Sequence, residues 1–121
     1  MGMGPQEAAE ASGVTIETLR YYERVGLLDR VPRATNGHRR YRAEDIEWIE
    51  VLRCLRATRM PIRNMARYAE LARGGPETED ERERMLREHR TQVVEQLGEI
   101  EVALRKIDEK LAWYETEEQG T

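Results

Sequence analysis

Apolar residues recur every seven positions over residues 77–121, and this repeat constrains the fold more than any other feature of the chain. Two such series interleave at intervals of three and four, as the a and d positions of a coiled coil do. A helix over residues 78–117 would be about 60 Å long at about 1.5 Å per residue. The residues of the two series are Leu86, Val93, Leu97, Ile100, Leu104, Ile107, Leu111 and Tyr114.

The simplest partner for this stripe is the same helix of a second chain, because the 76 residues before it are too few to cover it. In an antiparallel pair, the N-terminal segments of the two chains would lie at opposite ends, which suits a two-fold symmetric DNA site. The repeat therefore predicts a homodimer held by an antiparallel coiled coil, with the eight residues above as its dimer interface.

Charge divides the chain at the same place. The whole chain has a formal net charge of −4, but residues 1–76 hold 13 Arg against 10 acidic residues and residues 77–121 hold 7 basic against 14 acidic residues. Gly74-Gly75-Pro76 marks the boundary. We therefore expect a domain over residues 1–73, a hinge over 74–76, and a dimerisation helix with a short tail over 77–121.

Two short helical segments separated by a tight turn lie near the N-terminus. The first is a run of helix formers ended by Gly13, and Thr15 is a good N-cap for the second, which Gly26 would end. This spacing is typical of a helix-turn-helix, whose second helix enters the major groove of DNA.

The surface of that second helix carries residues suited to DNA. Arg20 can bond phosphates or guanine edges, and the hydroxyl of Tyr21 can bond phosphates. Tyr22 lies about 100° further round the helix, so we expect it to pack inward.

A basic hairpin follows. Asn36-Gly37 is a strong signal for a tight turn between two short strands, over residues 29–33 and 38–42. From residue 18 to residue 42 the chain holds seven Arg against two acidic residues, a net charge of +5. The hairpin is therefore predicted to be a wing that lies along the DNA backbone, with Arg39 and Tyr41 on one face of its second strand.

Two further helices are expected over residues 43–59 and 62–72, separated by Pro61. Arg63 lies in the first turn of the second, where unpaired backbone N–H groups favour a phosphate. The broad apolar face of the first helix comprises Ile46, Trp48, Ile49, Val51, Leu52 and Leu55.

Three motifs together closely resemble the signature of MerR-family transcription regulators. They are residues 12–28 (SGVTIETLRYYERVGLL), residues 36–41 (NGHRRY) and Glu44-Asp45-Ile46. The resemblance covers nearly the whole chain and implies a mainly α-helical protein, with a winged helix-turn-helix followed by a long dimerisation helix. Two departures stand out: Met3-Gly4-Pro5 replaces the family's short first strand, and His38 replaces the usual Tyr of the wing.

The resemblance implies that the homodimer binds a pseudo-palindromic promoter operator and distorts the DNA, so that RNA polymerase on the same promoter is controlled. No cofactor and no metal site are expected, because the chain has one cysteine and two histidines that lie far apart in the sequence. The residues predicted to contact DNA are Thr15, Thr18, Arg20, Tyr21, Arg39, Tyr41 and Arg63.

Cys54 is the candidate effector-sensing residue. Residues 45–56, together with Met60-Pro61-Ile62, are similar to the MerR subgroup that responds to aldehydes and other electrophiles through one cysteine at this position. Cys54 lies about 140° from the centre of the apolar face of its helix, so burial in the main core is not expected. A lone cysteine is otherwise most often a small buried hydrophobe.

Two other functions stay open at this point. The protein could be a family member without cysteine-based sensing, either a simple repressor or a regulator with an unknown ligand, or the acidic helix could be an interaction module for another protein. An enzyme is not expected, because no histidine lies near Cys54 in the sequence to activate it. The chain has neither a signal peptide nor a run of eighteen apolar residues, which predicts a cytoplasmic protein without a membrane span.

Overall fold

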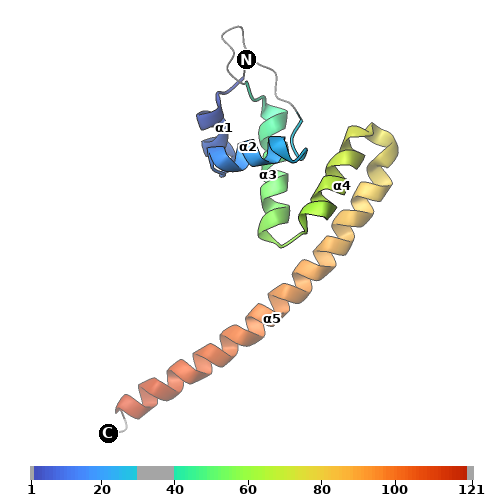
Figure 1. Ribbon diagram of the computed structural model, residues 1–121. Helices are drawn as coiled ribbons and strands as arrows, with labels where there is room; N and C mark the ends of the chain where they lie inside the picture. Colours follow the sequence, from blue (N-terminus) through green and yellow to red (C-terminus); the bar gives the residue numbers. More distant parts are fainter. Residues whose placement is uncertain (1, 30–39, 120–121) are drawn as a thin grey trace. The chain divides into compact units, whose positions relative to one another are not determined.

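The computed structural model describes residues 2–29 and 40–119, and these form five α-helices and one short 3-10 helix (Figure 1). The chain divides into two compact units, residues 1–82 and residues 83–121. The order of helices confirms the predicted helix-turn-helix, the following helix pair and the long C-terminal helix. In chain order they are α1 (Pro5–Ser12), α2 (Ile16–Arg24), α3 (Ala43–Ala57), α4 (Ile62–Arg73), η1 (Gly75–Thr78) and α5 (Glu79–Gln119).

Local signals in the sequence set the helix ends. Pro5 occupies the first turn of α1, where its missing N–H removes no helical hydrogen bond. Gly13 ends α1 at φ 75°, and Gly26 follows α2 at φ 80°, a region that glycine reaches without steric cost. At the start of α3, the carboxylate of Asp45 accepts a 2.8 Å hydrogen bond from the backbone N–H of Arg42. Both glycine stops agree with the sequence prediction.

The core of the first unit is built around α3. Four of the six residues predicted for its apolar face are buried, whereas Trp48 and Val51 are half-buried. The ring of Trp48 stacks on that of Tyr68 in α4, with centroids 5.7 Å apart. The core residues from the other segments are Ala8, Ala9, Leu19, Tyr22, Leu27, Leu28, Tyr41, Met60, Met65, Tyr68, Ala69 and Leu71.

The N-terminal segment keeps one antiparallel β-bridge. The backbone N–H of Met3 donates to the carbonyl of Tyr41 at 2.7 Å, and the N–H of Tyr41 donates to the carbonyl of Met3 at 2.8 Å. Where the resemblance implies a short first strand, Met3-Gly4-Pro5 therefore contributes a single bridge among the described residues. The predicted turn at Asn36-Gly37 and most of the hairpin lie outside the described residues.

The predicted hinge forms a compact corner in which η1 follows Gly74. The first unit extends past this corner to Arg82. α5 then runs for 41 residues without interruption, close to the expected span of 78–117.

Candidate nucleic-acid interface

The start of α2 is fixed by a threonine cap. The hydroxyl oxygen of Thr15 accepts a 3.1 Å hydrogen bond from the backbone N–H of Thr18. The two threonine hydroxyls lie 2.9 Å apart. This confirms Thr15 as the N-cap and leaves it exposed, with Thr18 half-buried beside it.

The two faces of α2 differ as the sequence predicted. Leu19 and Tyr22 are buried and anchor the helix to the core, whereas Arg20 and Arg24 are exposed. The guanidinium of Arg24 lies 5.5 Å from the ring centroid of the half-buried Tyr21, a cation–π contact. Burial raises the pKa of Tyr22, and Arg56 opposes this shift in part. α2 therefore displays two arginines and part of a tyrosine from a firmly anchored helix.

Tyr41 differs from its prediction. Only 1% of it is exposed, and its hydroxyl donates to Glu23 Oε1 in α2 at 3.1 Å. A direct phosphate contact needs an exposed hydroxyl, so the structure corrects this assignment. Tyr41 packs in the core and joins the base of the hairpin to α2. Arg39, predicted to share a strand face with Tyr41, lies outside the described residues.

Arg63 is exposed in the first turn of α4, as predicted. The N-cap of α4 is Pro61, so no side chain caps this end. The first backbone N–H groups of a helix point outward and carry partial positive charge. Arg63 and this helix start together form a candidate anion site on the first unit.

Cys54 is exposed on α3, which confirms that it lies outside the core. Its carbonyl accepts a 2.8 Å hydrogen bond from the hydroxyl of Thr58, one turn further along. The thiol is therefore accessible to a small electrophile in the single chain.

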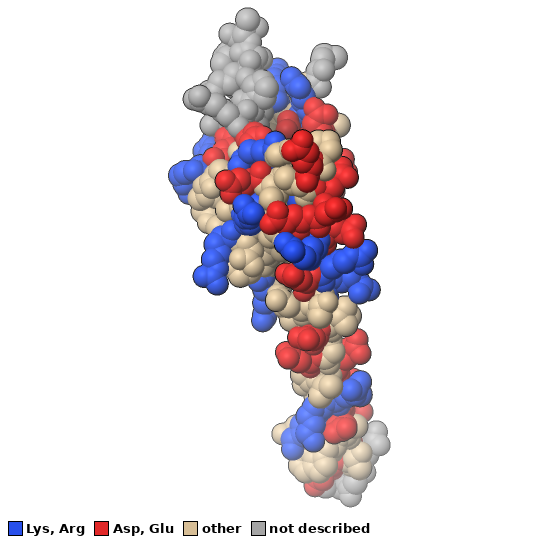
Figure 2. Space-filling view, turned by 90° about the vertical axis from the view of Figure 1, so that its right-hand side faces the viewer, with Lys and Arg blue, Asp and Glu red and all other residues tan. Residues whose placement is uncertain are grey.

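Most of the predicted dimer residues on α5 are exposed in the single chain. Leu97, Ile100 and Leu104 are 53%, 63% and 54% exposed, and Val93 is half-buried. Figure 2 shows uncharged side chains lying between basic and acidic ones along the lower, narrower part of the view. An apolar stripe of this length exposed on one helix needs a partner surface.

Three contacts around the end of α2 have no signal in the sequence. The indole N–H of Trp48 donates to the carbonyl of Leu27 at 2.8 Å. Arg73 bonds both Asp29 and the carbonyl of Gly26. The partners of Arg73 are 44 and 47 residues away in the sequence, so no local pattern signals them.

In the part of the chain that the structure describes, no group of three or more His, Cys, Asp or Glu side chains is placed to hold a metal ion. Nor does any described helix combine the length and the apolar character needed to cross a bilayer.

Comparisons with known proteins agree on one family. The model described as "MerR HTH family regulatory protein" matches residues 3–71. An uncharacterized HTH-type transcriptional regulator of Haemophilus influenzae is 35% identical over 109 residues, which cover 90% of this chain and 81% of that protein. The HTH-type transcriptional regulator AdhR of Bacillus subtilis is 39% identical over 93 residues, which cover 77% of this chain and 66% of AdhR.

Solved structures show the same similarity. HiNmlR, a MerR family regulator lacking the sensor domain and solved bound to promoter DNA, superposes with a TM-score of 0.87 at 34% identity. The match covers 96% of this chain and 92% of HiNmlR. A putative MerR family transcriptional regulator of Listeria monocytogenes superposes with a TM-score of 0.85 at 34% identity, covering 94% and 86%.

Proposed function

Because the chain belongs to the MerR HTH family of regulatory proteins, we propose that it binds promoter DNA as a homodimer and controls transcription there. The family consists of transcriptional regulators and not of enzymes. The observation that carries the proposal is α2, a threonine-capped helix that is anchored by Leu19 and Tyr22 and exposes Arg20 and Arg24. The similarity to HiNmlR over almost the whole of both chains supports it.

In this proposal α2 enters the major groove. Arg20 reads base edges, and Tyr21 contacts phosphates beside it. Thr15 and Thr18 lie at the start of the helix, where the N-terminal dipole favours a phosphate. Arg63 and Arg39 contact the DNA backbone, while Tyr41 acts from the core by holding α2 in place.

The apolar stripe of α5 pairs with that of a second copy in an antiparallel coiled coil. The two α2 helices then read the halves of a pseudo-palindromic operator. Distortion of the DNA between the half-sites controls RNA polymerase on the same promoter.

Duplex binding at several salt concentrations tests the DNA-binding proposal. Operator fragments are first selected from genomic DNA with the purified protein. Arg20→Ala should reduce the free energy of binding to the operator by about 1–3 kcal/mol and relax specificity. Arg63→Ala should weaken binding to all duplexes, and should reduce the slope of log K against log[salt] (the salt slope) by about 1. Arg87→Ala, which removes an exposed arginine paired with Glu83 on α5, is the control. Binding that is independent of salt, or insensitive to both α2 and α4 variants, would contradict the proposal.

We further propose that Cys54 is the effector-sensing residue for aldehydes. Its thiol would add to the carbonyl carbon, with the S–H proton passing to the carbonyl oxygen, to give a hemithioacetal. The adduct would shift the relative placement of the two DNA-binding units of the dimer. The exposure of Cys54 on α3 supports this assignment.

The matched variant Cys54→Ser keeps the size of the side chain and removes the thiol. It should retain operator binding and lose the transcriptional response to formaldehyde or methylglyoxal. A normal response in Cys54→Ser would instead favour a simple repressor, or a regulator with a different ligand.

A further inference from the structure

The turn that follows α2 is held by side chains from other helices. Inside the turn, the N–H groups of Val25, Gly26 and Leu27 bond the last carbonyls of α2. The carbonyls of Gly26 and Leu27 themselves accept from Arg73 and Trp48. The position of the end of α2 therefore depends on α3 and α4.

Arg73 holds this turn at two points. Its Nε donates to Asp29 Oδ1 at 2.6 Å, and its Nη2 donates to the carbonyl of Gly26. These two acceptors flank Leu27 and Leu28, which are only 1% and 3% exposed. A guanidinium donates from a rigid planar fork, so the two bonds together fix orientation as well as distance. The last residue of α4 thereby holds the turn at the end of α2 in position.

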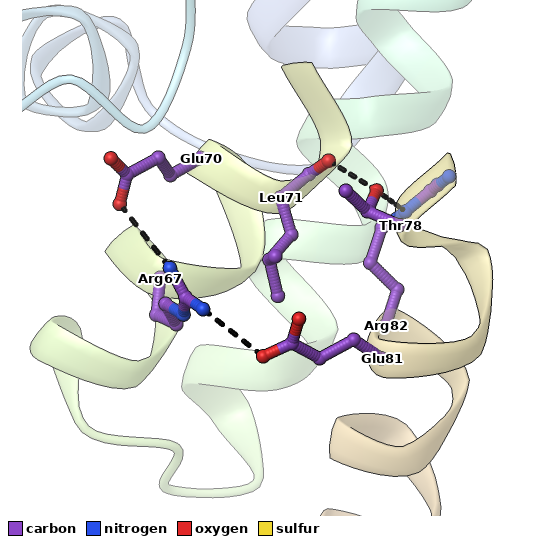
Figure 3. A network of polar contacts seen from close by, with 6 residues as sticks. All are labelled: Arg67, Glu70, Leu71, Thr78, Glu81 and Arg82. Atoms are coloured by element: carbon purple, nitrogen blue, oxygen red, sulfur yellow. Dashed lines mark hydrogen bonds and ion pairs between the residues drawn. The ribbon is translucent and has the colours of Figure 1, made fainter. Parts of the chain in front are cut away.

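The last turn of α4 also holds the end of η1, and η1 in turn holds the first turn of α5 (Figure 3). The hydroxyl of Thr78 bonds the carbonyl of Leu71. Arg82 donates from Nε to the hydroxyl of Thr78 at 3.0 Å and from Nη2 to the carbonyl of Gly75 at 2.9 Å. The corner is also closely packed, because a Cβ on Gly74 would lie 2.8 Å from Thr78 Cγ2.

A second contact joins α4 to α5 one turn away from this corner. The guanidinium of Arg67 lies 3.0 Å from Glu81 Oε1 and 3.9 Å from Glu70 Oε2 (Figure 3). The first turn of α5 and the last two turns of α4 are thus joined by side chains as well as by the backbone.

We infer that Arg73 is a positioning residue that couples the first turn of α5 to the C-terminal end of α2. Leu71, which receives Thr78, lies two residues before Arg73, which holds Gly26 and Asp29. A displacement of the first turn of α5 therefore reaches α2 through Thr78 of η1 and the last turn of α4. The inference rests on the proposed function only in treating α2 as the DNA-reading helix.

Amide hydrogen exchange in the full-length protein without DNA tests the coupling. Arg73→Gln should speed exchange at Val25, Gly26 and Leu27 roughly two- to fivefold. Arg73→Lys keeps the charge but cannot donate from a planar guanidinium. Its exchange rates at these amides should lie between those of Arg73→Gln and those of the unsubstituted protein. Arg87→Gln, which breaks a comparable exposed pair on α5, should leave these amides unchanged.

A double-mutant cycle separates coupling from a purely local role. Thr78→Val should also speed exchange at the end of α2, but should add little when Arg73 is already Gln. If Thr78→Val does not fold, Arg82→Gln can replace it, because it removes the hydrogen bonds of Arg82 to Thr78 and Gly75. The inference would be overturned if the two substitutions changed the exchange rates additively, or if Arg73→Gln left exchange at the end of α2 unchanged.

Binding to a selected operator duplex gives a second readout. Arg73→Gln should weaken binding about two- to fivefold without changing the salt slope, because Arg73 is not proposed to touch phosphate. A slope reduced by about 1 would show a direct phosphate contact and overturn the positioning role. If the protein bound no duplex, the proposed function would fail, while the exchange data would still decide the role of Arg73.

Discussion

The hydroxyl of Tyr41 has two possible roles, a contact with a DNA phosphate or a hydrogen bond to Glu23 within the protein. An experiment can separate them. The sequence places this hydroxyl on a phosphate, whereas the structure gives it to Glu23 Oε1 at 3.1 Å. Tyr41→Phe removes that one oxygen and keeps the buried ring. In the first reading the variant weakens only the DNA complex, and in the second it weakens the folded protein without DNA.

The magnitude follows from the geometry. Hydrogen bonds to charged groups contribute about 1.5–3 kcal/mol when they are short and buried. At 3.1 Å this bond is longer than the usual O–H···O range, and Glu23 is half-buried. We therefore expect a loss of about 1 kcal/mol, which corresponds to about 4–8 °C in Tm for a domain of this size.

Thermal and urea unfolding at a fixed protein concentration, without DNA, measures this loss. Tyr68→Phe is a matched control, because it also removes one hydroxyl from a buried ring. In a cycle with Glu23→Gln, the coupling energy between Tyr41 and Glu23 should be about 0.5–1 kcal/mol. An unchanged unfolding midpoint together with weaker DNA binding would refute the core role of Tyr41.

Three further predictions concern pH, backbone conformation and assembly. Burial raises the pKa of Tyr22, so the folded state holds a proton that the unfolded state releases above about pH 10. Stability should therefore fall as the pH rises beyond that point, and urea titrations of Tyr22→Phe should show a smaller fall. Gly13→Ala should cost about 1–3 kcal/mol in thermal unfolding, because φ is 75°, where an alanine backbone is strained, whereas the flexible side chain of Arg53 can move away from the new Cβ. Leu104→Lys should lower the mass found by sedimentation from dimer to monomer, whereas Val102→Lys, equally exposed but outside the heptad series, should not.

Much of the candidate interface follows from residues close together in the sequence. Thr15 caps the N–H of a residue three positions later, and Leu19, Tyr22 and the two surface arginines of α2 follow the helical period. The same periodicity correctly placed Cys54 outside the core. Such relations span one or two turns of helix, so a local pattern is enough to read them.

Tyr41 shows where local patterns fail. Alternation along a strand assigns a side chain to one of two faces, but it does not say which face the rest of the protein covers. Here the core covers the face of Tyr41, and Glu23, 18 residues away, receives its hydroxyl.

Local patterns predict the helix order, the helix ends and the apolar stripe of α5, because capping, glycine conformations and periodicity act over a few residues. The burial of Tyr41 and the contact by which Arg73 joins the end of α2 to the corner before α5 follow only from the packed fold. Arg73 reaches acceptors 44 and 47 residues away. Such contacts arise only when the helices pack, since packing brings together residues that no local spacing relates.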